Sequence, residues 1–108
     1  MTSDVFRALA ETHRRDILDS LAAGEKAVGT IVTDLSLSQP QVSKHLRVLS
    51  AAGLVKCRSD GRRRLYRVEP ARLRPLQDWL VKYEQAWTER LDRVEDYLRA
   101  LQGQGDQQ

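Results

Sequence analysis

Side chains that could hold a polyanion are concentrated in the middle of the 108-residue chain. Residues 39–67 contain eight lysines and arginines and one acid, Asp60, so this block carries a net charge of +7. The flanking segments 1–38 and 76–101 each hold four basic and six acidic residues, a net −2. A basic block between acidic flanks favours one surface that faces nucleic acid. The alternative is an ordinary solvated charged face.

The other reactive residues do not form the pattern of a catalytic or metal site. Cys57 is the only cysteine, which excludes a multi-cysteine metal site within one chain, and we expect it to be buried on a strand. The histidines are His13, expected at the surface, and His45, expected between a helix and the body of the protein. The sequence contains no Gly-rich phosphate loop and no nucleophile elbow. We therefore expect no catalytic residue, no metal and no cofactor.

The best-defined element that could position the basic side chains is a helix over residues 39–51. Ser38 followed by Gln41 is a capping box, and Pro40 is tolerated in a first helical turn. A shorter helix is predicted over residues 29–35, and residues 36–38 form the turn between the two. This arrangement is typical of a helix-turn-helix.

The outward face of this helix is small, polar and basic. Val42, Leu46 and Leu49 are spaced to face inward, and no acid lies between residues 39 and 59. Amide, hydroxyl and ammonium groups near a helix N-terminus suit the base edges of a major groove. We expect DNA contacts from the outward residues Gln39, Gln41, Ser43, Lys44 and Arg47. The alternative is that these are ordinary solvated polar positions.

A β-hairpin is predicted to supply a second contact. Residues 54–58 and 64–68 alternate as strands do, and the Asp60-Gly61 pair between them is a strong turn signal. We expect Arg62, Arg63 and Arg64, at or next to this turn, to reach phosphates or a minor groove, with the hairpin tip at residues 59–64. Leu65 is expected to point to the face opposite Arg64.

Three more helices complete the expected elements. Two short ones cover residues 4–11 and 12–23, the second capped by Thr12, and a long one covers residues 76–101. The long helix has an apolar stripe longer than a domain of this size needs, which favours a second copy as its partner. The expected dimer contacts are Phe6 and Leu9 of the first helix, and Trp79, Tyr83, Trp87, Leu91, Val94 and Leu98 of the last.

These elements define a mainly α fold with a small β wing, a winged helix-turn-helix with a long C-terminal dimerisation helix. We expect a single domain over residues 1–102 and a flexible tail over residues 103–108. The first residues are polar and acidic, unlike a secretory signal, and no apolar run is long enough to span a bilayer. A cytoplasmic protein without a membrane partner is therefore expected.

The chain also resembles a known family. Leu37–Leu49, Ala52–Val55 and Asp60–Tyr66, with the segments Phe6–Ala10 and Thr12–Leu18, closely resemble the ArsR/SmtB family of bacterial winged-helix repressors. The resemblance implies a homodimer that binds a double-stranded inverted-repeat operator and blocks transcription, and some such proteins repress their own operon. It implies base contacts from Gln39, Ser43 and Lys44, and backbone contacts from Arg62 and Arg63. The cysteine pairs and histidine clusters of the metal-sensing relatives are missing, so the chain looks like a metal-independent member with an unknown effector.

Two other functions are compatible with the sequence. A winged-helix module could serve protein–protein contact, or could bind nucleic acid without sequence preference. The +7 block favours nucleic acid over protein, and the polar, capped face of the helix favours specific reading over coating. An enzyme is the weakest alternative, because no activated nucleophile or paired acid and base can be assigned.

Overall fold

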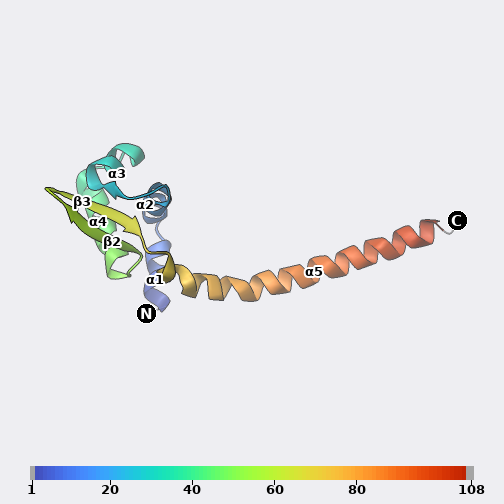
Figure 1. Cartoon of the computed structure of the whole chain (residues 1–108). Helices are drawn as coiled ribbons and strands as arrows, with labels where there is room; N and C mark the ends of the chain where they lie inside the picture. Colours follow the sequence, from blue (N-terminus) through green and yellow to red (C-terminus); the bar gives the residue numbers. More distant parts are fainter. Residues whose placement is uncertain (1, 107–108) are drawn as a thin grey trace. The chain divides into compact units, whose positions relative to one another are not determined.

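The computed structural model describes residues 2–106 and divides the chain into two compact units, residues 1–76 and residues 77–108. The first unit contains four helices, a three-stranded antiparallel sheet and a 3-10 helix (Figure 1). The helices are α1 (Thr2–Leu9), α2 (Thr12–Ala22), α3 (Val28–Leu35) and α4 (Gln39–Ala51), and the 3-10 helix is η1 (Pro70–Leu73). The strands are β1 (Lys26–Ala27), β2 (Val55–Asp60) and β3 (Arg63–Val68).

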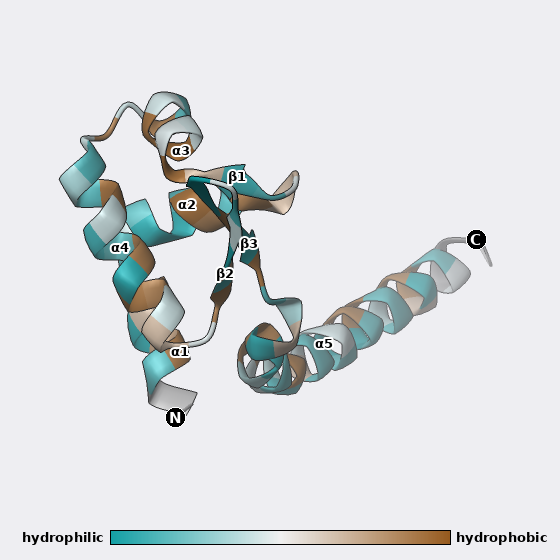
Figure 2. Cartoon of the chain, turned by 60° about the vertical axis from the view of Figure 1, so that its left-hand side comes forward, coloured by the Kyte–Doolittle hydropathy of each residue, from teal (hydrophilic) through white to brown (hydrophobic). Residues whose placement is uncertain are grey.

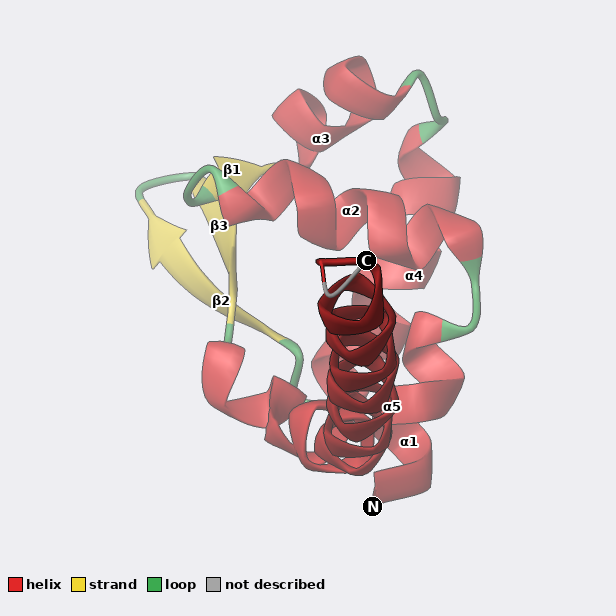
Figure 3. Cartoon of the chain, turned by 90° about the vertical axis from the view of Figure 1, so that its right-hand side faces the viewer, coloured by secondary structure: helices red, strands yellow, loops and turns green. Residues whose placement is uncertain are grey.

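The sheet lies beside the helices, with β3 in its centre (Figure 3). β3 contacts α2 and α3, whereas β2 contacts α4. The core between these elements consists of aliphatic side chains, and the largest of its fully buried members are Ile17, Ile31, Val42, Leu46, Leu49, Leu54 and Val55. The three α4 residues expected to face inward are therefore confirmed in the core.

Both ends of α4 are fixed by local hydrogen bonds, and its predicted bounds are confirmed. At the start, the Ser38 hydroxyl accepts from the Gln41 amide at 3.3 Å, and the Gln41 side-chain oxygen accepts from the Ser38 amide at 2.9 Å. At the end, the Leu54 amide donates to the Leu49 carbonyl at 2.9 Å, with Gly53 at φ +77°. This is the Schellman closure that a glycine favours. The orientation of α4 is thus specified at both termini.

The turn between α3 and α4 depends on one residue in an unusual conformation. Ser36 adopts a left-handed backbone, with φ 55° and ψ 36°, at the C-cap of α3. Short polar residues tolerate this region better than branched ones do. The left-handed step ends α3, so that Ser38 can cap α4 only two residues later.

The start of α2 differs from its prediction. Glu11, not Thr12, is the N-cap: it has an extended backbone, and its carboxylate accepts from the His13 amide at 3.5 Å. Thr12 is already helical, and its hydroxyl accepts a hydrogen bond from Arg15 at 3.3 Å. The prediction of a Thr12 cap was wrong because the neighbouring side chains of Glu11 and Thr12 can both cap a helix. Threonine is the more common N-cap residue, so the sequence pattern favours it.

The sheet is more extensive than predicted. β2 and β3 reach two residues and one residue further toward the turn, which leaves only Gly61, at φ +63°, and Arg62 between them. Cross-strand pairing runs from Val55 opposite Val68 to Asp60 opposite Arg63. β1 was not predicted, because two residues are too few to show a strand period. It pairs with β3 far along the chain, Lys26 opposite Tyr66.

The second unit consists of one helix, the main part of α5 (Arg74–Asp106). The helix starts two residues before the predicted residue 76, with Pro75 in its first turn, and continues beyond residue 101. Residues 103–106 of the expected tail are therefore helical, and residues 107–108 lie outside the described residues. The division into one domain over 1–102 and a tail over 103–108 stays a prediction.

Apolar and polar residues alternate along α5 (Figure 2). The large apolar side chains are exposed along its length, from Trp79 at 46% to Trp87 at 57% and Leu98 at 51%. None of the described helices has both the length and the apolar character needed to cross a bilayer.

Candidate nucleic-acid interface

The outward face of α4 carries the side chains expected to read DNA. Gln39, Gln41, Lys44 and Arg47 are exposed, and Ser43 is half-buried. The opposite face is anchored in the core, so these side chains project from a helix whose position is fixed by packing. The first turn of α4 contains no acid. This end of the helix therefore combines a favourable helix dipole with uncharged or basic side chains.

Gln41 has a structural task that limits its role at the surface. Its side-chain oxygen accepts the hydrogen bond from the Ser38 amide that completes the capping box. Its amide NH₂ group remains free to face a ligand. The side chain cannot use both of its polar groups on an adenine without breaking the cap.

His45 lies between α4 and the body of the first unit, as predicted. It is only 9% exposed, and its Nδ1 atom forms no hydrogen bond with any described residue. Its ring lies 5.6 Å from the ring of His13. His13 was expected at the surface but is half-buried. Burial, followed by the charge of Arg14, lowers the pKa of His45. The imidazole is therefore neutral at pH 7 and acts as a packing residue of α4.

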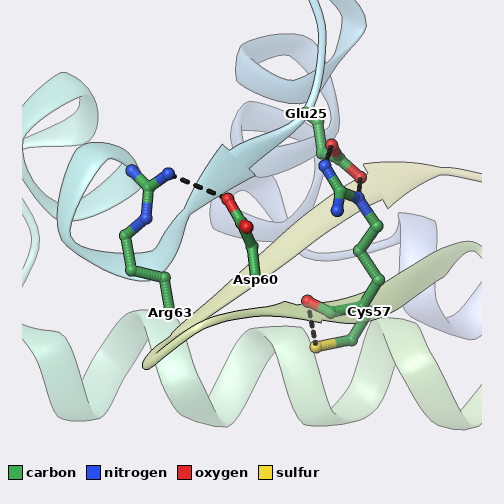
Figure 4. A network of polar contacts seen from close by, with 5 residues as sticks. Glu25, Cys57, Asp60 and Arg63 are labelled. Atoms are coloured by element: carbon green, nitrogen blue, oxygen red, sulfur yellow. Dashed lines mark hydrogen bonds and ion pairs between the residues drawn. The ribbon is translucent and has the colours of Figure 1, made fainter.

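The three expected wing arginines differ in their surroundings. Arg62 lies in the two-residue turn and Arg64 is exposed on β3. Arg63 forms an ion pair with Asp60 at 3.1 Å, next to the turn (Figure 4). Because both partners of this pair are largely exposed, it contributes little stability and can be exchanged for another anion.

Arg58, a further member of the basic block, is held by an acid from outside that block. Its guanidinium donates two hydrogen bonds to the carboxylate of Glu25, at 2.7 and 2.8 Å (Figure 4). These hydrogen bonds lower the pKa of Glu25. The pair is not evident in the sequence, because 33 residues separate its members. Arg58 is therefore less available to an external anion than the basic residues of the block that form no ion pair.

Cys57 is exposed, so the expectation that it is buried was wrong. On β2 only Val55 is buried, and the five residues that follow are exposed on both faces. The hairpin extends beyond the core at this point, so the alternation of side chains no longer selects buried positions. The Sγ atom lies 4.0 Å from the carbonyl oxygen of Arg58 (Figure 4).

A polar groove separates α4 from β3. It has a volume of about 400 Å³ and is lined by Ser43, Arg47, Ser50, Arg64 and Tyr66. Ser43, Arg47 and Ser50 lie on one face of α4 at steps of four and three, and Arg64 and Tyr66 share one face of β3. Leu65, between them, is buried, which confirms that it points to the other face. Ser50 and Tyr66 were not predicted as site residues, although their spacing from Arg47 and Arg64 is present in the sequence.

The expected dimer residues are placed on two separate units. Phe6 and Leu9 are half-buried on α1. Trp79, Tyr83, Trp87, Leu91, Val94 and Leu98 are all exposed on α5. Large apolar side chains exposed in a row are typical of a surface that a partner covers. Among the described residues, no three His, Cys, Asp or Glu side chains lie close enough together to hold a metal ion.

Comparison with known proteins places these features in a family. The model of the bacterial regulatory proteins of the arsR family matches residues 12–56. The HTH-type transcriptional regulator Rv2034 of Mycobacterium tuberculosis is 40% identical over 101 residues, which are 94% of this chain and 89% of that protein. The transcriptional repressor SdpR of Bacillus subtilis is 28% identical over 81 residues, 75% of this chain and 90% of SdpR.

A solved structure agrees with the fold. It is the solution NMR structure of the homodimeric winged helix-turn-helix DNA-binding domain Mb0332 of Mycobacterium bovis, a possible ArsR-family transcriptional regulator. The TM-score is 0.64 at 36% sequence identity, and the match covers 76% of this chain and 78% of that chain. The expected fold class, mainly helical with a small β wing and a long C-terminal helix, is confirmed.

Proposed function

Because this chain belongs to the ArsR family of bacterial regulatory proteins, we propose that it is a homodimeric repressor that binds an inverted-repeat operator. The family and the relatives named above are transcriptional regulators, so the chain is a winged helix-turn-helix regulator and not an enzyme. We expect the protein to act on DNA in the cytoplasm. No effector is assigned.

The outward face of α4 is the observation that carries this proposal. Gln39, Ser43 and Lys44 are the base-reading residues, because they lie near a helix N-terminus that is firmly capped and free of acids. Gln41 joins them only through its amide NH₂ group. Arg47 lies further along the same face and meets the backbone. Helix 39–51 then occupies the major groove.

The hairpin tip, residues 59–64, is proposed to touch the backbone or an adjacent minor groove. Arg62 contributes a charge with no ionic partner among the described residues. Arg63 reaches the backbone by exchanging its exposed ion pair with Asp60 for a phosphate. Arg64 faces the groove beside α4. Such contacts add affinity without reading sequence.

The second copy is proposed to pack through α1 and α5. The exposed stripe of α5 supports this, and the Mycobacterium bovis relative is a homodimer in solution. A two-fold dimer would present two α4 helices to successive major grooves, about 34 Å apart. An operator with two inverted half-sites follows from that symmetry.

A footprint of the purified protein on its own genomic DNA tests this function. The protected sequences should share an inverted repeat, and a duplex carrying it should bind about a thousandfold more tightly than random duplex at the same salt concentration. Equal affinity for both duplexes would instead support the alternative of sequence-neutral nucleic-acid binding. Failure to bind any duplex at low salt would favour the other alternative, a winged-helix module for protein–protein contact.

A further inference from the structure

We propose that the groove between α4 and β3 binds one phosphodiester group of the DNA backbone, held by Arg47 and Arg64 and by the hydroxyls of Ser50 and Tyr66. The inference rests on the proposed function and adds to it a defined anion site. Two of its members, Ser50 and Tyr66, belong to neither of the surfaces described above as DNA contacts.

The lining of the groove has the composition of an anion site. All five side chains donate hydrogen bonds, two are permanent cations, and no carboxylate is among them. Neither Arg47 nor Arg64 forms an ion pair with any described residue, in contrast to Arg58 and Arg63. The guanidinium fork matches two phosphate oxygens at once.

Tyr66 is the most restricted donor in the groove. It is half-buried and pairs across the sheet with Cys57. Burial, followed by the neighbouring Cys57 thiol, raises the pKa of its hydroxyl, so Tyr66 stays protonated at neutral pH and can donate. Arg64 lies close enough to oppose this shift, which places a guanidinium and a hydroxyl donor at the same point of the groove.

The position of the groove identifies its ligand as duplex DNA. The sugar-phosphate strand of a duplex separates the major groove from the minor groove. If α4 enters the major groove and the hairpin tip touches the backbone or the adjacent minor groove, the strand that separates the two grooves would lie across the groove between α4 and β3. The volume of about 400 Å³ exceeds the roughly 30 Å³ share of a single water molecule, so a phosphodiester and its waters have room there.

Salt-dependent binding of four variants tests the site. Arg47→Gln and Arg64→Gln should each reduce the salt slope of log K by up to about 0.9 for each subunit, about 1.8 for the dimer, equally for operator and random duplex. Tyr66→Phe and Ser50→Ala should weaken binding to both duplexes by about tenfold or more, because each removes a hydrogen bond to a charged group. Arg67→Gln is the matched control: it removes the same charge from β3, but Arg67 lines a different groove, with α2. Thermal melting confirms that each variant is folded.

A second measurement locates the phosphate. Single methylphosphonate substitutions in the operator neutralise one phosphate at a time. One position in each half-site should weaken the wild type, yet have no further effect on the Arg47→Gln, Arg64→Gln double variant. If the double variant retains the wild-type salt slope and responds to every position as the wild type does, the phosphate site is wrong while the repressor function stands. If the wild type ignores duplexes at low salt, the proposed function fails as well.

Inorganic phosphate distinguishes the other possible source of the anion. In NMR titrations without DNA, the amides of Ser43, Ser50 and Tyr66 should shift only weakly and without saturation below millimolar phosphate. Saturable binding at micromolar phosphate would identify a free anion as the ligand and overturn the assignment to the DNA backbone.

Discussion

At the scale of single residues, the two kinds of DNA contact should respond differently to mutation. Gln39→Ala or Lys44→Ala should reduce the preference for the operator over random duplex by about 1–3 kcal/mol, because each removes a hydrogen-bonding group from a base edge. If discrimination survives both changes, the assignment of base reading to α4 is wrong. Competition titrations with the two duplexes measure this preference directly.

The wing arginines provide the contrasting case. Arg62→Ala combined with Arg63→Ala should weaken all duplexes alike, and the salt slope should fall by about 0.9 for each phosphate that is no longer neutralised. Arg63 must first give up its weak, exposed ion pair with Asp60, so Arg62→Ala alone should account for at least half of the decrease in affinity. Fluorescence anisotropy at four or five salt concentrations gives the slope.

His45 should make the stability of the first unit depend on pH. Its pKa in the folded protein is lowered by burial and by Arg14, so the unfolded chain binds its proton more readily. The stabilising contribution is complete above the unfolded pKa, about 6.5, and is lost as pH falls through the lower folded value. His45→Leu removes the unpartnered buried Nδ1 atom, so its melting temperature should fall less between pH 7.5 and 5.5 than that of the wild type. Equal decreases for both proteins would exclude His45 as the cause.

At the scale of elements, Gln41 shows how a capping role and a binding role can be separated. Glutamate also completes a capping box, so Gln41→Glu should preserve the free energy of unfolding, with up to about 0.5 kcal/mol gained from the helix dipole. The new carboxylate faces DNA phosphates, so affinity should fall by about tenfold or more. Ser38→Ala is the converse change: it should lower the free energy of unfolding by about 1 kcal/mol. Chemical denaturation and DNA titration of both variants separate the two roles.

The elements that could be predicted are those specified by neighbouring residues. The bounds of α4 follow from Ser38, Gln41 and Gly53, which act within a few positions. β1 exists only because β3 lies beside it, and no local pattern reports a partner so far along the chain. The site was predictable only in part for the same reason. The outward face of α4 follows from the spacing within one helix, whereas the groove combines Ser50 of α4 with Tyr66 of β3. Exposure of Cys57 was missed because the hairpin outreaches the core.

At the scale of the whole molecule, the exposed stripe of α5 should decide the assembly state. Trp87→Glu puts a charge in the middle of the stripe and should yield a monomer in analytical ultracentrifugation, because a buried unpaired carboxylate strongly opposes association. Tight operator binding should disappear with it, since one α4 helix then reads one half-site alone.

The control adds the same charge elsewhere on the helix. Gln85→Glu lies off the apolar stripe, two residues from Trp87, and should leave both assembly and binding unchanged. If Trp87→Glu remains a dimer, the interface does not lie on the apolar stripe of α5. Dissociation of the dimer in both variants would point to charge in general and not to the stripe.

The exposed position of Cys57 has a practical consequence for experiments on this protein. The sequence contains one thiol, and it lies on the outer part of β2, close to the hairpin tip. A maleimide dye or nitroxide would therefore attach to the wild-type chain at a single known place, without any engineered handle. In a two-fold assembly the two labels would report the separation of the wings, so their spacing with and without operator could be followed spectroscopically.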